Sequence, residues 1–190
     1  MSLMQRLRAS LWPGNGAGEQ SRRAGYALYA AAVTAAREPG LYRSLAVPDT
    51  LDGRFDLVGL YAALMIRRLR QLPEPGPALA QAVFDAMFSD MDLNLREMGV
   101  GDLSVGRKVR QMWEAFHGRA MAYEDALEAG DAAGLAAALA RNVWRGAAPE
   151  GVAEGLARLA LAQRDALAGQ GLDRLGTGEV RFLTMTEAGI

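Results

Sequence analysis

Cysteine is absent from this chain, and lysine and histidine occur once each, as Lys108 and His117. The lack of cysteine excludes a disulfide framework, a thiolate metal site and a cysteine nucleophile. A single histidine cannot supply the two Glu-x-x-His motifs of a di-iron bundle. The sequence also lacks a Gly-x-Ser-x-Gly motif, and a serine nucleophile would need a neighbouring base. We therefore expect a protein that is not an enzyme and that carries no cofactor.

Long apolar runs and an excess of positive charge are also lacking. The richest apolar run, LVGLYAALMI, falls well short of the roughly 20 residues that span a bilayer. The formal net charge is −1, with acidic and basic residues interleaved. A nucleic-acid-binding protein usually carries a basic patch or stripe, so we expect no direct contact with nucleic acid. The Gly-rich stretch GNGAGEQ lacks the Lys-Ser/Thr pair of a phosphate-binding loop.

What the chain does contain is helical periodicity. Its 190 residues are 51% hydrophobic and 23% charged, which is typical of one globular domain. Apolar residues recur every three or four positions through most of the chain. The pattern predicts an all-α fold, a single compact domain of about six main helices joined by short turns. These predicted helices cover residues 21–37, 55–72, 77–98, 103–129, 131–144 and 149–168.

Several boundaries follow from capping residues. Ser21 is the predicted N-cap of the first helix, and Asp102 or Ser104 that of the fourth. Gly99 and Gly130 are predicted to end the third and fourth helices. The segments LYRSLAV and PDTLDGR are read as turns. The stretch GTGEVRFLTM near the end of the chain has modest strand character.

The predicted apolar faces follow from the spacing of apolar residues. On the first helix they are Tyr26, Tyr29, Ala30 and Val33. Met87, Met91 and Met98 follow the apolar row of the third helix. Their spacing favours a place in the core, and the alternative is an adaptable surface for apolar partners.

The chain divides into three predicted parts. Residues 1–20 form a flexible N-terminal segment, of which residues 1–3 resemble an expression leader. The stretch MQRLRASLW reads either as a frayed terminus or as a basic amphipathic turn that anchors at a membrane surface. Residues 21–183 form the helical domain, and residues 184–190 a C-terminal tail.

Other polar groups admit a chemical and a structural interpretation. Glu114 and His117 share one helical face, and His117 with a methionine could ligate a haem. The structural alternative is a histidine at the edge of the apolar stripe. Asp85, Asp90 and Asp92 suggest either a divalent-cation site or solvated carboxylates.

Two glycines inside the fourth predicted helix, Gly106 and Gly118, each cost roughly 1 kcal/mol relative to alanine. We therefore expect close neighbours at both positions. Those neighbours would belong either to this chain or to the backbone of a partner.

Three stretches of the chain are long and unusual in composition. They cover residues 28–69, with VPDTLDGRFD, residues 88–127, with REMGVGD, and the shorter LARNVWRG together with GEVRF. On these residues the chain resembles the ubiquinol–cytochrome c chaperone family, and its abundant Arg and Ala indicate a bacterial member. Where a Leu-His pair is expected in the family, this chain has Leu60-Tyr61, so no role is transferred to a histidine there.

The resemblance implies a helical, non-enzymatic assembly factor for respiratory complex III that acts on cytochrome b or its assembly intermediates. It also implies further contacts with the ribosome or with a small partner protein. The expected place is the cytoplasm or the cytoplasmic face of the inner membrane, where the protein would associate peripherally.

We expect partner recognition around the junction of the third and fourth helices, where charged residues flank two glycines. These residues are Asp90, Asp92, Arg96, Glu97, Gly99, Val100, Gly101, Asp102, Arg107 and Lys108. The alternative for each charge is a surface ion pair, worth about 0–1 kcal/mol in general. The alternative function is a helical bundle that binds haem or a small apolar ligand through His117 and the methionines.

Overall fold

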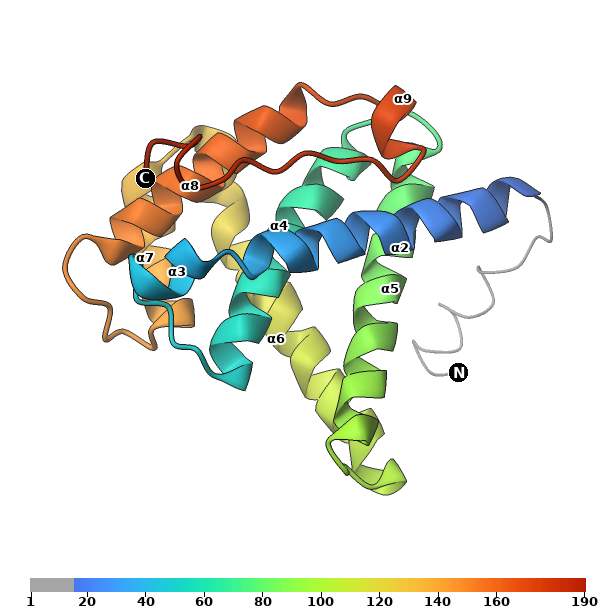
Figure 1. Cartoon of the computed structure of the whole chain (residues 1–190), viewed down its shortest axis with the longest axis horizontal. Helices are drawn as coiled ribbons and strands as arrows, with labels where there is room; N and C mark the ends of the chain where they lie inside the picture. Colours follow the sequence, from blue (N-terminus) through green and yellow to red (C-terminus); the bar gives the residue numbers. More distant parts are fainter. Residues whose placement is uncertain (1–15) are drawn as a thin grey trace.

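The structure, a computed structural model, describes residues 16–190. Residues 1–15, which include the predicted leader and the basic turn, lie outside the described residues. Within the described range the chain forms eight helices and no strand, so the predicted all-α fold is confirmed (Figure 1). The helices are α2 (Gly16–Ala36), α3 (Pro39–Arg43), α4 (Leu51–Arg70), α5 (Gly76–Glu97), α6 (Asp102–Ala129), α7 (Ala132–Val143), α8 (Val152–Ala168) and α9 (Leu172–Leu175).

Helix α4 lies at the centre of the molecule and contacts α2, α5, α6, α7 and α8. Its side chains are buried on almost every side, among them Leu57, Leu64, Met65 and Leu69. Each large apolar side chain that is fully buried contributes about 1.5–3 kcal/mol relative to its exposed state. The central helix therefore accounts for much of the core, and the other helices pack around it.

Helix α2 packs on α5 mainly through small residues, and only part of its predicted apolar face is buried. Its buried face consists of Ala24, Leu28, Ala32 and Ala36, with Tyr29 beside them. Tyr29 is buried as predicted, whereas Tyr26 is 48% exposed and Ala30 is also exposed, so the predicted place of these two residues in the core is wrong. Residues without long side chains let the two helices approach closely, and a Cβ on Gly25 would overlap Ala82 of α5. Close approach therefore favours the face of α2 that carries the alanines and leaves Tyr26 outside the core.

Three predicted boundaries are also wrong. Helix α2 covers Gly16–Ala36, so Ser21 lies inside it rather than capping it. Helix α4 starts at Leu51, within the stretch expected to be a turn, because the Thr50 hydroxyl accepts a hydrogen bond from the Gly53 N–H at 3.2 Å. The segment expected as a turn after Glu38 contains the short helix α3, with Pro39 in its first turn.

The last twelve residues return across the body of the protein. Residues 179–184 form neither helix, strand nor turn, and they cross α4 and α8 toward α3 (Figure 1). The expected strand is therefore absent. No second strand pairs with this segment. The backbone N–H and C=O groups of Arg181 and Leu183 bond instead to the side chains of Gln170 and Gln163, respectively.

Candidate functional site

The junction of α5 and α6 is a glycine-dependent turn. Helix α5 ends at Glu97 with Met98 as its C-cap, and Gly99 takes a left-handed φ of 80°. The Gly99 N–H bonds to the Arg96 carbonyl, and the Val100 N–H bonds to the Leu95 carbonyl. This is the Schellman pattern that closes a helix C-terminus, and the predicted stop at Gly99 is confirmed. Helix α6 then starts after Gly101, whose N-cap position has no side-chain bond, so the predicted cap by Asp102 or Ser104 is wrong.

Arg96 joins the two helices across this turn. Its Nε donates to Asp92 one turn earlier on α5 at 2.6 Å, and its Nη1 donates to Asp102 at 2.5 Å. Asp102 is therefore occupied by the arginine instead of capping α6, although an acid in the first turn still suits the helix dipole. All three side chains are substantially exposed. The turn thus presents a fixed array of charge at the surface.

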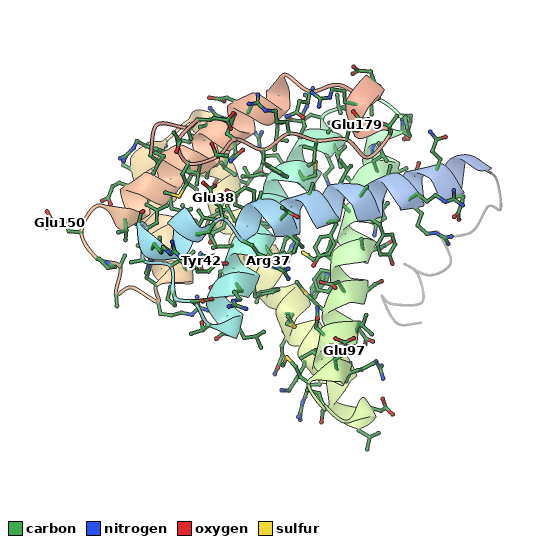
Figure 2. The ribbon with its side chains drawn as sticks, viewed as in Figure 1. Arg37, Glu38, Tyr42, Glu97, Glu150 and Glu179 are labelled. Atoms are coloured by element: carbon green, nitrogen blue, oxygen red, sulfur yellow. The ribbon has the colours of Figure 1, made fainter. Side chains whose placement is uncertain are left out.

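Exposed apolar side chains surround this array. Leu103 is fully exposed, and Leu93 and Met98 are each more than half exposed. Figure 1 shows the ends of α5 and α6 extending below the rest of the molecule, and Figure 2 labels Glu97 on this projecting part. Isolated exposed leucines are ordinary, but three large apolar residues at one protruding turn are typical of a contact surface. We call this surface, residues 89–110, the hairpin tip.

The ten predicted recognition residues do not all share the same surroundings. Asp92, Arg96 and Asp102 lie in one ion-pair array. Glu97, Arg107 and Lys108 are exposed nearby. Asp90 is partly buried, and its carboxylate accepts a hydrogen bond from the Tyr29 hydroxyl of α2 at 2.7 Å. Asp90 therefore ties α5 to α2, whereas the other charged members lie outward.

A second polar cluster, which the sequence did not suggest, surrounds Asp56 of α4. Its carboxylate is buried and is contacted by Arg145 and Arg119, each at 2.8 Å. Burial raises the pKa of Asp56, while the two guanidinium groups act in the opposite direction. Arg119 also lies over the ring of Phe55, 5.5 Å from its centroid. Read locally, Asp56 is an ordinary polar residue next to Phe55, so no signal in the sequence indicates this cluster.

The Asp56 cluster brings together the three stretches that carry the family resemblance. Asp56 belongs to VPDTLDGRFD, Arg119 to the second stretch and Arg145 to LARNVWRG. Beside the cluster, the Trp144 indole N–H donates to the carbonyl of Ala46 at 2.9 Å. These unusual runs therefore meet at one buried ion cluster that holds α4, α6 and the α7–α8 loop together.

His117 does not face the interior of the helices. It is exposed on α6 and stacks on Trp113, with ring centroids 5.4 Å apart and an interplanar angle of 7°. Glu114 pairs with Arg110 instead. Met87 and Met91 are buried in the core, as their spacing predicted, whereas Met98 is 55% exposed. The geometry therefore does not favour a haem held between His117 and a core methionine.

The three aspartates considered for a cation each have a separate partner. Asp85 accepts from Gln81, Asp90 from Tyr29 and Asp92 from Arg96. Among residues 16–190 no group of three or more His, Cys, Asp or Glu side chains could hold a metal ion.

A cavity of about 290 Å³ lies between α4, α6 and α8, lined by Arg67, Arg68 and Arg164 among others. These arginines already bond to Glu124 and Glu128, to the Gln170 carbonyl and to the Leu127 carbonyl, respectively. The acids whose pKa burial raises, Asp56 and Asp85, do not line this cavity.

The expectation of close neighbours at Gly106 and Gly118 is wrong within the described part of the chain. A Cβ on either residue would meet no atom within 4 Å. Intramolecular packing therefore does not explain these glycines. Contact with a partner's backbone, the other interpretation, stays a prediction.

No helix among residues 16–190 combines the length and the apolarity needed to cross a membrane. The fold and its surface define an all-helical protein with a projecting, charged hairpin, a form suited to contact with other proteins. The family model described as ubiquinol-cytochrome C chaperone matches residues 43–182, and the chain belongs to this family.

Two relatives agree with this assignment. The crystal structure of the Cbp3 homolog from Brucella abortus has a TM-score of 0.80 and 31% sequence identity, and the alignment covers 98% of this chain and 99% of that one. The ubiquinol-cytochrome-c reductase complex assembly factor 1 of Xenopus laevis is 26% identical over 102 residues. That match takes 54% of this chain and spans only half the length of the Xenopus protein.

Proposed function

We propose that this protein is a non-enzymatic assembly factor for the ubiquinol–cytochrome c reductase complex and that its client is cytochrome b. The observation that carries the proposal is membership of the ubiquinol-cytochrome C chaperone family over residues 43–182. The printed name of the Xenopus relative, a complex assembly factor, supports the same role. The protein acts by recognition of other proteins.

The hairpin tip is the surface that we assign to recognition. It combines exposed Leu93, Met98 and Leu103 with charges that face solvent. Apolar groups with a charged rim suit the ends of membrane helices, which are apolar along their length and polar where they leave the bilayer. The proposed contact residues are Asp90, Asp92, Arg96, Glu97, Gly99, Val100, Gly101, Asp102, Arg107 and Lys108.

A client that inserts into a membrane also determines where the protein works. We propose that it works at the cytoplasmic face of the inner membrane and associates there peripherally. The ribosome and a small partner protein are the further contacts proposed for it. Co-purification from the native host in mild detergent tests for the membrane client, the ribosome and the small partner protein. Failure to recover any of the three would contradict this placement.

The site assignment is tested with an Asp92→Ala/Arg96→Ala variant in a pull-down of cytochrome b. The matched control is Glu19→Ala/Arg23→Ala, which removes an exposed ion pair of the same i,i+4 spacing on α2. We expect the tip variant to lose the client while the control retains it, with identical helical content by circular dichroism. Equal recovery of cytochrome b by both variants would refute the assignment to the tip.

A second variant tests the apolar part of the tip. Leu103→Ser changes a side chain that contacts solvent only, so folding is expected to be unaffected while client recovery falls. The function as a whole is tested by deletion of the gene in its host. Normal levels of the assembled complex in the deletion strain would contradict the proposed function.

A further inference from the structure

The end of the chain is held by a buried glutamine of α8. The Gln163 side chain is 1% exposed, and its amide makes two bonds to one residue. Its nitrogen donates to the Leu183 carbonyl at 2.6 Å, and its oxygen accepts from the Leu183 N–H at 2.9 Å. An amide that offers a donor and an acceptor side by side reproduces what a neighbouring β-strand offers to a backbone.

Gln170, just beyond α8, repeats the arrangement two residues earlier along the tail. Its amide nitrogen donates to the Arg181 carbonyl at 2.8 Å, and its amide oxygen accepts from the Arg181 N–H at 2.9 Å. Arg68 of α4 fixes the Gln170 backbone with two hydrogen bonds to its carbonyl, at 2.8 and 3.1 Å. The two glutamines therefore bind alternate residues of the tail.

The alternation continues at the next position. The Met185 N–H donates to the carboxylate of Glu38, which Figure 2 labels between α2 and α3, at 3.0 and 3.2 Å to the two oxygens. The side chains of Phe182 and Met185 pack against apolar groups of the body. Phe182 packs edge-on against the buried ring of Tyr61, with centroids 5.1 Å apart. Met185 is 5% exposed and fills the space above Gly40, where a Cβ would lie 2.5 Å from its sulfur.

The contacts of Gln163, Gln170 and Glu38 with the tail all join a side chain of the body to the backbone of the tail. Backbone groups are the same in every chain, so these contacts do not depend on the tail's sequence. The apolar contacts require only large apolar residues at the positions of Phe182 and Met185. If the tail left this surface bare, the polar side chains of Gln163, Gln170 and Glu38 would lose their partners in the tail. Each lost partner costs free energy, so the bound state of the site is favoured over the empty one.

We propose that Gln163, Gln170, Glu38 and Tyr61 form a binding site for an extended apolar peptide, that residues 179–185 occupy it within the same chain, and that an extended segment of an unfolded client displaces them. The client as the incoming peptide rests on the proposed function. The peptide site itself does not, because the chain's own tail is its first ligand.

Displacement requires the tail to open without unfolding of the body. Hydrogen exchange of the full chain measures this directly, because the Arg181, Leu183 and Met185 amides are all bonded in the closed state. We expect these amides to exchange faster than those in the middle of α4, through a local opening. Exchange of the tail at the same rate as α4 would mean that it opens only on global unfolding, and would overturn the proposal.

Binding in trans is tested with a labelled synthetic peptide of residues 177–190 and the full-length Phe182→Ala protein. The substitution weakens the resident tail and leaves the site intact, so the peptide should bind about tenfold more tightly than to the wild-type chain, which corresponds to the loss of one aromatic contact. A peptide with proline at the position of Leu183 is the matched control, because it cannot donate to Gln163. Met185→Ala in the protein repeats the measurement at a second position.

The contribution of the Gln163 amide to peptide binding is tested by combining Gln163→Leu with Phe182→Ala. This variant also has a weakened tail but lacks the amide that binds the backbone, and we expect it not to bind the peptide. Equal peptide affinity for the wild-type and Phe182→Ala chains, or equal binding of the proline peptide, would overturn the proposal. None of these measurements involves cytochrome b, so a negative result would not contradict the proposed assembly function. Conversely, loss of the client by the tip variants would not contradict the peptide site.

Discussion

The guanidinium of Arg145 donates to the buried carboxylate of Asp56 at 2.8 Å, although 89 positions separate the two residues in the sequence. Arg145 reaches it from a left-handed backbone conformation, with φ of 56°. A non-glycine residue in this region carries strain that its surroundings must offset. The ion pair and the adjacent bond from Trp144 to Ala46 supply that compensation.

Loss of the Asp56 charge is expected to destabilise the protein strongly. In Asp56→Asn, Arg119 keeps its mostly buried guanidinium but loses its counter-charge. Breaking a buried ion pair by removing one partner costs about 3–5 kcal/mol, and the exposure of Arg145 places the expected loss near the lower end. Urea unfolding measures it. Asp52→Asn, which removes a mostly exposed acid 4.0 Å from Arg145, is the control and should change the midpoint little; equal effects of the two would contradict a role for the buried pair.

Two glycine-to-alanine substitutions should have opposite effects on stability. A Cβ on Gly53 would overlap the carbonyl oxygen of Pro48, a backbone atom that cannot move aside easily, so Gly53→Ala should destabilise by about 1–3 kcal/mol. A Cβ on Gly106 would meet open space inside a helix, so Gly106→Ala should stabilise by about 0.5–1 kcal/mol. Thermal unfolding of both variants checks the pair. A stable Gly106→Ala protein with weakened client recovery would place a partner at this face of α6.

Stability should fall at alkaline pH because of buried tyrosines. Burial raises the pKa of Tyr29, Tyr61 and Tyr123 above the ordinary value of 10.0, and the hydrogen bond to Asp90 raises that of Tyr29 further. The unfolded chain therefore loses these protons at a lower pH than the folded protein does. The stabilisation is complete below pH 10.0 and decreases as the pH rises above it.

The unfolding free energy measured against pH tests this linkage. Tyr29→Phe should make the alkaline decrease shallower, whereas Tyr26→Phe, at a ring that is 48% exposed, serves as the control. The same slope in Tyr29→Phe and in the wild-type protein would contradict the prediction.

Trp144→Phe should cost about 1–3 kcal/mol, because it removes the indole donor and leaves the Ala46 carbonyl without its partner. Trp144 is 5% exposed, so the substitution also reduces packing. Denaturant unfolding gives the cost. Trp113→Phe, at a partly exposed ring on α6 without such a bond, should be nearly neutral, and a neutral Trp144→Phe would show that the bond to Ala46 contributes little.

The helices and the corner at Gly99 could be predicted from local sequence. Helical periodicity and capping act between residues only three to five positions apart, so Leu79, Val83 and Met87 on α5 indicate its buried row directly. The ends of helices were less certain, because Thr50 and Ser21 are both good caps in isolation. Thr50 caps α4 because its hydroxyl reaches the Gly53 N–H, whereas Ser21 lies inside α2.

The Asp56 cluster and the tail contacts could not be predicted in this way. Asp56 and Arg145, like Gln163 and Leu183, are distant in sequence, and each is an ordinary polar residue when read locally. The family resemblance indicated which stretches are unusual but not that they meet.

The sequence by itself determined the helical class, the position of the α5–α6 turn and the absence of cysteine chemistry, because each depends on composition or on short-range contacts. The tertiary structure alone decided which face of α2 is buried, which polar groups are withdrawn from solvent around Asp56 and where the last residues run. Those outcomes depend on how closely helices far apart in the chain can approach, and a small residue such as Gly25 permits the close approach to Ala82 only once both helices are in place.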